Sequence, residues 1–186
     1  MKTVTIGRNV KMPNESYFGY YFKECNSLET VTVESISEIG YNAFKSVGAA
    51  LKGDIVINEG VTKIYGEGVF SGCSSITSVS FPSTLTEIGA GAFKNCTSLK
   101  TAKLPTGVTL IGDWAFENCS SLEDEVVIEE GVTVGRWAFG GKCGIKKLTV
   151  KDNAIIKMEA FQECYNLSNV WIKDNVTINR RQFWKM

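Results

Sequence analysis

The chain has 186 residues, with 20 Lys and Arg against 20 Asp and Glu, and it contains no histidine. A formal charge of zero gives no overall attraction to nucleic acid or to an anionic membrane, so we predict that the protein binds no nucleic acid. The first 20 residues carry Lys2, Arg8 and Lys11 and no apolar run, so we expect neither a secretory signal nor direct membrane insertion.

Phenylalanine recurs at a nearly constant interval and opens the same phrase each time. The series consists of Phe22, Phe44, Phe70, Phe93, Phe116, Phe139, Phe161 and Phe183. The spacings are 22, 26, 23, 23, 23, 22 and 22 residues. A period in the low twenties is typical of a solenoid, in which each repeat buries its apolar face on its neighbours. We therefore expect a core that runs as a ribbon along the whole stack.

Each repeat contains short segments in chain order. Residues 4–6 read like a first strand, and later repeats carry equivalent period-two alternations. These predicted half-buried strands include residues 31–33, 79–81, 102–104, 126–128, 148–150 and 170–172. A turn rich in Gly, Pro, Asp and Asn follows, then a second short alternation, and then Ala-Phe-x-x-Cys, which predicts about one helical turn.

Six cysteines occupy one fixed place in their repeats. They are Cys25, Cys73, Cys96, Cys119, Cys143 and Cys164. One cysteine per turn favours buried, inert thiols that act as small apolar side chains. Zinc is the sharper alternative, but the chain lacks both histidine and a C-x-x-C pair. Oxidation of ladder neighbours to a disulfide stays open, because strands about 5 Å apart are within the reach of a disulfide.

The repeated phrase resembles a known family. A Leu-x-x-Val-x-Ile/Leu strand precedes Ala-Phe-x-x-Cys-x-x-Leu, with clear copies starting at Phe70, Phe93, Phe116 and Phe161. This combination resembles the BspA-like leucine-rich repeats of bacterial surface antigens and of some protist surface proteins. The resemblance covers nearly the entire chain.

That resemblance implies both a fold and a role. The fold is an α/β, right-handed leucine-rich-repeat solenoid, or horseshoe, with a parallel β-sheet on the concave face and short strands or helical turns on the convex side. Residues 1–186 should form a single solenoid domain of about seven repeats. The implied role is binding or adhesion, often at a cell surface or in a secreted protein, although a cytoplasmic location stays open.

Both ends of the chain look cut, because neither carries the polar cap that a solenoid needs. Residues 183–186 stop just after the last repeat's Phe. We expect that a further segment exists, or that the ends are covered by dimer or lattice contacts. A true start at Met1 is the alternative.

The outward side chains of the strand ladder form the one continuous surface whose residue types are not constrained by packing in the core, so we expect binding there. In the first half this surface carries mostly small hydroxyls, whereas the second half mixes an aromatic residue with charges, as interface hot spots do. The candidate binding residues are Lys103, Glu125, Val127, Lys147, Thr149, Lys151, Trp171 and Lys173. The competing interpretation is that Trp171 merely shields the last repeats.

Two further patterns allow alternatives. Trp114 and Trp137 occupy equivalent places, so they should lie one above the other and pack the outer wall, or else form a sugar-binding platform. Residues 117–130 hold six acidic and no basic residues, whereas nine Lys or Arg outnumber four Asp or Glu from Lys142 onward. This asymmetry predicts either a bipolar surface that steers a partner or simply a solvated face.

The sequence argues against an enzyme. Without histidine there is no Ser/His or Cys/His nucleophile pair, and neither a phosphate-binding glycine loop nor a dinucleotide fingerprint is present. Glu129 and Glu130 are adjacent on a strand and should point to opposite faces. We therefore predict no catalytic residue, cofactor or metal, and a protein partner, which could be a host extracellular-matrix or cell-surface protein. A structural spacer, or a repeat appendage without a ligand of its own, is the alternative.

Overall fold

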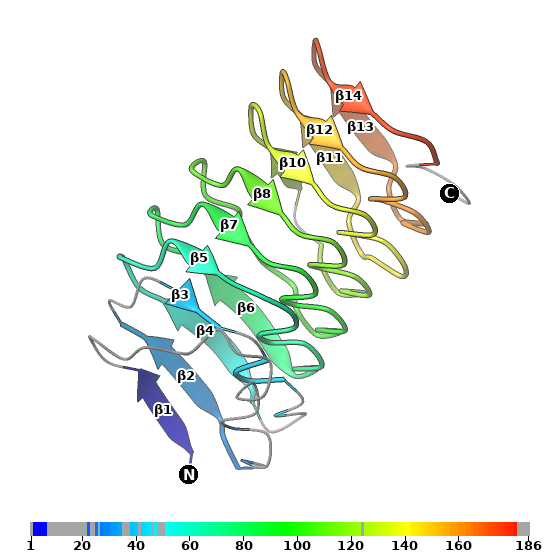
Figure 1. Cartoon of the computed structure of the whole chain (residues 1–186). Coiled ribbons are helices and arrows are strands. Elements are labelled where there is room, and N and C mark those ends of the chain that lie inside the picture. The colour runs from blue at the N-terminus through cyan, green and yellow to red at the C-terminus, as the bar shows by residue number, and fades with distance from the viewer. Residues whose placement is uncertain are drawn as a thin grey trace.

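The chain winds into a stack of turns whose strands all run parallel to their neighbours, with the two ends of the chain at opposite ends of the stack (Figure 1). The computed structural model describes residues 2–6, 22, 25, 27–34, 38–40, 42–45, 47, 51–123 and 125–181. The solenoid expected from the 23-residue period is thereby confirmed.

The longer strands form one side of the stack, interrupted at residues 102–104, and we call their outward surface the broad-strand face. They belong to two sheets, β1-β2-β4-β6 and β9-β11-β13. The bounds are Thr3–Ile6 for β1, Thr30–Val33 for β2, Gly53–Ile57 for β4, Ile76–Ser80 for β6, Val126–Ile128 for β9, Lys147–Val150 for β11 and Asn169–Ile172 for β13. Alternate side chains of β2 are buried, as its Thr-Val-Thr-Val pattern predicts.

Two-residue strands form a second, uninterrupted ladder of seven, in the order β14-β12-β10-β8-β7-β5-β3. The bounds are Glu38–Ile39 for β3, Lys63–Ile64 for β5, Glu87–Ile88 for β7, Leu110–Ile111 for β8, Thr133–Val134 for β10, Ile155–Ile156 for β12 and Thr177–Ile178 for β14. Figure 1 shows this ladder running along the stack beside the longer strands. It holds successive turns in register where the longer strands do not.

The expected helical turn is instead a tight hydrogen-bonded turn, and no described residue is helical. The N–H of Cys96 donates to the carbonyl of Phe93 at 3.2 Å, which closes one turn. The N–H of Phe93, however, donates to the carbonyl of Ala115 in the next repeat at 2.7 Å. Because the backbone donors of this segment reach the neighbouring turn, an i to i−4 helical ladder does not develop. None of the described residues belongs to a helix that could cross a membrane.

The phenylalanine series forms a column of parallel rings through the core. Consecutive rings from Phe22 to Phe161 lie 4.9–5.3 Å apart between centroids, with interplanar angles of 1–11°. Six of these side chains, from Phe44 to Phe161, are fully buried. Phe183 and residues 184–186 lie outside the described residues. The column confirms the expected core ribbon for the repeats that can be followed.

One expected strand is wrong: residues 102–104 do not join the sheet. The ladder from β6 ends in a single bridge between Ser78 and Thr101. In four other repeats, the residue after the strand donates its N–H back to the preceding strand, as Lys151 does to the carbonyl of Ile128 at 2.9 Å. Pro105 holds this place after residues 102–104 and has no N–H. Pro82 holds the same place after β6, which nevertheless pairs with β4, so the missing donor shortens the ladder but does not by itself open it.

The next turn also departs from the repeat pattern. Three residues separate Leu122 from Val126, whereas two separate Leu99 from Ala102. The longer strands divide into two sheets at this point. The same spacing between Leu51 and Ile55 is accommodated within the first sheet by a register shift at Gly53 and Asp54, so the extra residue alone does not divide a sheet. The seven-stranded ladder continues past the division, because β8 and β10 pair directly.

Candidate binding surface

The row of outward side chains expected in the second half is present. The strand registers pair Val127 with Thr149 and Thr149 with Trp171. Directly opposed side chains on one face of a sheet lie within contact distance of each other. Three of the eight candidate residues therefore form a continuous line across β9, β11 and β13.

Polar contacts link this line to the charged candidates. The hydroxyl of Thr149 donates to Oε1 of Glu125 at 2.9 Å. The ammonium of Lys151 lies 2.5 Å from Oε2 of Glu129. Lys147 and Lys173 are exposed at the two ends of the surface, with no ion pair of their own among the described residues. The surface thus combines paired carboxylates with free lysine ammonium groups.

Trp171 is the aromatic member of this row, and 51% of its surface is open to solvent. Its neighbours on β13 are also open: Val170 and Ile172 are 37% and 40% exposed although they occupy core-facing places. In the previous strand, the equivalent residues Leu148 and Val150 are buried. The exposure of Trp171 therefore has two sources, its outward direction and its position on an edge strand.

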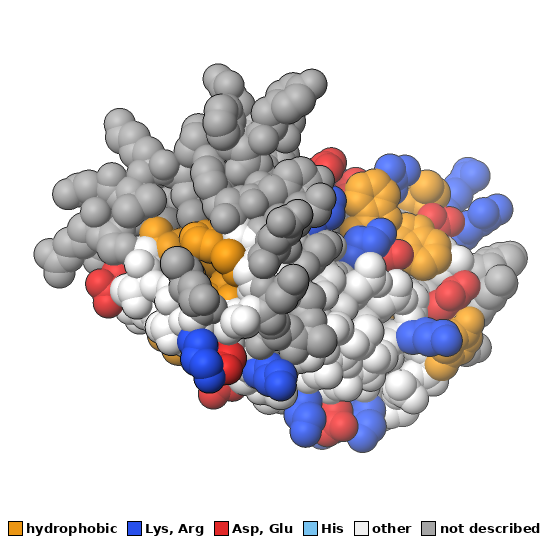
Figure 2. Space-filling model, turned by 90° about the horizontal axis from the view of Figure 1, so that it is seen from below, with side chains coloured by type: hydrophobic (Ala, Val, Ile, Leu, Met, Phe, Trp, Pro, Cys, Tyr) orange, Lys and Arg blue, Asp and Glu red, His pale blue; other side chains and the backbone are white. Residues whose placement is uncertain are grey.

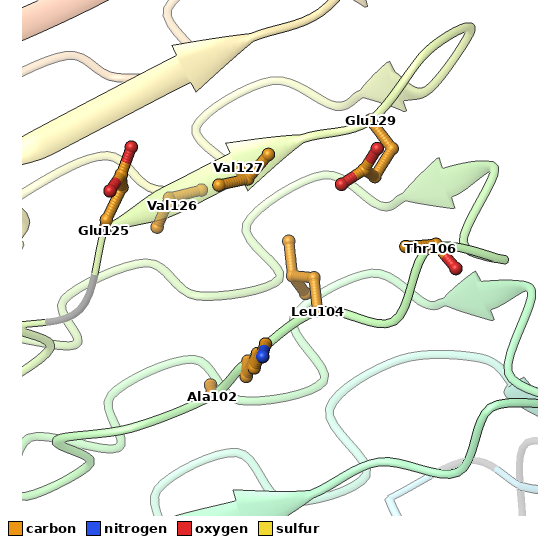
Figure 3. A pocket seen from close by; sticks show the side chains of 8 residues that line it. Ala102, Leu104, Thr106, Glu125, Val126, Val127 and Glu129 are labelled. Atoms are coloured by element: carbon orange, nitrogen blue, oxygen red, sulfur yellow. The ribbon is translucent and has the colours of Figure 1, made fainter.

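Lys103 lies apart from the other candidates, across the interruption of the sheet. It lines a cleft of about 390 Å³ together with Ala102, Leu104, Thr106, Glu125, Val126, Val127 and Glu129. In Figure 3 the side chain of Leu104 points from its segment toward β9, and Glu125 and Glu129 flank that strand at either end. The structure thus brings three predicted residues, Lys103, Glu125 and Val127, to one hollow.

The remaining cleft residues were not among the sequence candidates, because the strand expected at 102–104 would have filled this space. Two signals in the sequence mark the position: Pro105 after the segment and the extra residue before Val126. Proline lacks a donor and an inserted residue displaces the register, but Pro82 and the insertion before Ile55 lie within a continuous sheet, so neither signal alone predicts the interruption.

The two tryptophans of the turn segment occupy equivalent places but do not stack on each other. The Arg136 guanidinium lies 5.8 Å from the ring centroid of Trp114, and the Lys94 ammonium lies 5.9 Å from the same centroid. The indole N–H of Trp137 donates to Glu159 at 2.9 Å. Among the described ring contacts there is none between the two indoles. Both tryptophans thus contact charged side chains of adjacent turns, Trp114 through its ring and Trp137 through its indole N–H.

Charge is distributed in pairs between successive turns. Lys94 and Glu117 lie 2.6 Å apart, and Lys63 and Glu87 lie 3.3 Å apart. Figure 2 shows basic and acidic side chains close together on the described part of the face seen from below, rather than in separate fields. The acidic stretch is likewise partnered, because Glu129 meets Lys151 and Glu130 accepts from Asn153 at 3.1 Å.

The cysteines form a buried column of free thiols, except for Cys25, which is partly exposed. The thiol of Cys96 donates to the carbonyl of Phe70 at 3.2 Å, and that of Cys119 donates to the carbonyl of Phe93 at 3.3 Å. Burial raises the pKa of the Cys73 thiol to about 12 and also raises the pKa values of Cys96 and Cys119. The thiols of Cys73, Cys96 and Cys119 therefore contribute packing and a weak hydrogen bond, and their raised pKa values disfavour the nucleophilic thiolate.

Comparison with known proteins identifies the repeat. Residues 2–123, 48–168 and 104–186 match the family described as the BspA type leucine rich repeat region, which the comparison finds in six copies. A search of curated proteins gives no match.

Solved structures agree on the fold. A leucine-rich repeat protein of T. pallidum is 23% identical with a TM-score of 0.69, over 93% of this chain and 76% of that one. A leucine-rich repeat protein from Bacteroides ovatus is 23% identical with a TM-score of 0.62, over 96% of this chain and 50% of that one. At this level of identity the two structures establish a shared fold.

Proposed function

The chain belongs to the family of BspA-type leucine-rich repeat proteins, and from this premise we propose that it is a protein-interaction module that binds its partner on the broad-strand face. The observation that carries the proposal is the line of Val127, Thr149 and Trp171 across three strands. An exposed aromatic anchor among charged neighbours is the arrangement that gives protein interfaces most of their binding energy.

The finer form of the proposal is adhesion at a cell surface, with a host extracellular-matrix or cell-surface protein as the partner. It follows the family resemblance, in which BspA-like repeats occur in surface antigens. A non-catalytic scaffold role is in keeping with the absence of histidine from the chain and with the raised pKa of the buried Cys73 thiol. The lysines at the rim of the surface suit an acidic or mixed-charge protein surface.

The test is an array of purified extracellular-matrix and cell-surface proteins, probed with this chain and with a Val127→Ala, Trp171→Ala double variant. We expect at least one protein to bind the wild type and to lose about tenfold or more in affinity with the folded double variant. A matched Trp114→Ala variant should bind normally, because Trp114 lies on the turn segment outside the broad-strand face.

A structural spacer is the second candidate, and the open edge at β13 favours it specifically. Because Val170 and Ile172 are exposed together with Trp171, the tryptophan could serve only to shield the last turn. In that case Trp171→Ala lowers the melting temperature and leaves the binding of every array protein unchanged. The melting temperature and the array binding of Trp171→Ala, measured together, therefore distinguish an interaction module from a spacer.

A further inference from the structure

The interruption of the broad-strand face leaves backbone groups without partners. Among the described residues, no backbone hydrogen bond involves an N–H or C=O of residues 102–104. Such groups normally pair with backbone, side chain or water. The cleft beside this segment, at about 390 Å³, is large enough to hold several water molecules or part of a peptide.

The other wall of the cleft is the free edge of β9. The carbonyl of Ile128 accepts from Lys151 in the following turn. Because successive residues of a strand direct their N–H and C=O groups to opposite sides, the groups of Val127 point the other way, toward residues 102–104. The cleft is thus bordered on both sides by backbone that can pair with an extended chain.

Side chains define what such a chain should carry. Leu104 and Val127 give the cleft an apolar middle, while Glu125 and Glu129 stand near the two ends of β9 (Figure 3). Lys103 is the one basic residue among the eight that line it, and Lys151 beside the cleft already pairs with Oε2 of Glu129, while Oε1 of Glu125 accepts from Thr149. Because a carboxylate can accept several hydrogen bonds, the two carboxylates can still meet basic residues that flank an aliphatic one.

The chain contains a strand that satisfies the same requirement on the opposite edge of β9. Strand β11 pairs there, buries Leu148 and Val150, and directs Thr149 and Lys151 to Glu125 and Glu129. Residues 146–151 read Lys-Lys-Leu-Thr-Val-Lys. Residues 146–151 are therefore an example, within this chain, of a basic-aliphatic segment that pairs with β9.

We propose that the cleft between residues 102–104 and β9 is a docking site for an extended basic-aliphatic segment of a partner protein, which pairs with the free strand edges by β-augmentation. The inference rests on the proposed interaction function and names the chemistry of the partner. The partner's backbone bonds to Val127 and to the unpaired segment, its aliphatic side chain contacts Leu104, and its basic side chains meet Glu125 and Glu129.

The test uses a synthetic peptide, Lys-Lys-Leu-Thr-Val-Lys, in an NMR titration of the full chain, with Glu-Glu-Leu-Thr-Val-Glu as the charge-reversed control. In the free protein we expect the amide proton of Val127 to exchange with solvent much faster than those of Val126 and Ile128. Saturation with the basic peptide should slow exchange at Val127 and leave its two neighbours unchanged. The acidic control should bind at least about tenfold more weakly.

Two variants separate backbone pairing from side-chain contact. Val127→Pro removes the N–H that faces the cleft and leaves the β9–β11 bonds in place, so peptide affinity should fall about tenfold. Val127→Thr keeps that N–H and should bind within about threefold of the wild type. If the proline variant fails to fold, the exchange measurement on the wild type still decides the question.

The outcomes distinguish this inference from the general function. Slowed exchange at Val127 with the basic peptide supports the docking site. No slowing at saturating peptide, or equal binding of the acidic control, overturns it. If an array protein nevertheless binds and loses affinity with the Val127→Ala, Trp171→Ala variant, the docking site fails while the interaction function stands; if no array protein binds either, both fail.

Discussion

At the residue scale, single positions are constrained by the closeness of neighbouring turns. A Cβ added at Gly112 would lie 2.6 Å from the backbone nitrogen of Ala90, and one at Gly135 would lie 2.5 Å from that of Asp113. Contacts this short with backbone cannot be relieved by turning a side chain. Glycine is required there because the turns touch, not because of its conformational freedom.

Gly112→Ala should therefore force two turns apart and destabilise the fold by about 1–3 kcal/mol, the usual cost of overpacking a well-packed site. Gly131 provides the control, since a Cβ there meets nothing within 4 Å and only its positive φ of 71° opposes substitution. Gly131→Asn, which tolerates that conformation, should cost under about 1 kcal/mol. Urea unfolding of the two variants measures the difference; equal losses would contradict the proposed contact.

The buried thiols make stability depend on pH in the alkaline range. Burial raises the pKa of Cys73 from its ordinary value of 9.0 to about 12. The folded state therefore keeps this proton when the unfolded state loses it, so the stabilisation is complete below pH 9 and is lost as the pH rises from 9 to 12.

The difference in unfolding free energy between wild type and Cys73→Ala isolates this effect from other titrating groups. It should shrink by up to about 1.4 kcal/mol for each pH unit above 9, because one pKa unit corresponds to that free energy. Urea unfolding at several alkaline pH values provides the measurement. If the unfolding free energies of the two proteins changed with pH in parallel, burial would not raise the pKa of Cys73.

At the element scale, the ring column is the feature that each turn shares with the next. Phe93 lies between Phe70 and Phe116, with centroids 5.3 Å away on both sides. Phe22 begins the column, has one such neighbour and is only partly buried. The cost of removing a ring should therefore depend on its place in the column.

Phe93→Ala should destabilise by about 3–5 kcal/mol, as for other fully buried aromatic side chains, whereas Phe22→Ala should cost clearly less. Differential scanning calorimetry of the two variants compares them directly. A Phe22 variant as unstable as the Phe93 variant would mean that burial in the column does not determine the loss.

The same scale shows what the sequence could and could not predict. The Thr-Val-Thr-Val segment of β2 could be predicted as a strand, because its alternation is that of a half-buried strand and strands of both adjacent turns pair with it. Residues 102–104 have a similar alternation, but only Thr101 before them bridges to β6, and no described strand pairs with them. Local periodicity predicts which side chains face inward, whereas ladder formation depends on the adjacent repeat. The cleft arises from that second condition and was missed for this reason.

At the scale of the whole molecule, a stack held by nearest-neighbour contacts should lose its outer turns before its middle. Strand β13 forms the edge of its sheet, and Ile172 and Ile178 are 40% and 45% exposed. In the middle of the stack the equivalent Ile128 and Val134 are buried. The last turn thus has fewer contacts to hold its backbone closed.

Hydrogen exchange followed by mass spectrometry should show faster exchange for peptides of β13 and β14 than for those of β9 and β10 under native conditions. Adding a concentration series separates fraying from self-association, since exchange at β13 should not depend on protein concentration if the turn is simply frayed. Slow exchange throughout the last turn at every concentration would contradict the nearest-neighbour description.

The central claim is that partner binding occurs on the broad-strand face, and side-chain oxidation in the presence of a bound array protein tests it most directly. Trp171 and Trp114 serve as internal reporters, because Trp171 lies on that face and Trp114 lies on the turn segment. We predict that the partner lowers the oxidation of Trp171 and leaves that of Trp114 unchanged. Protection of Trp114 alone, or the absence of any bound protein, would contradict the account.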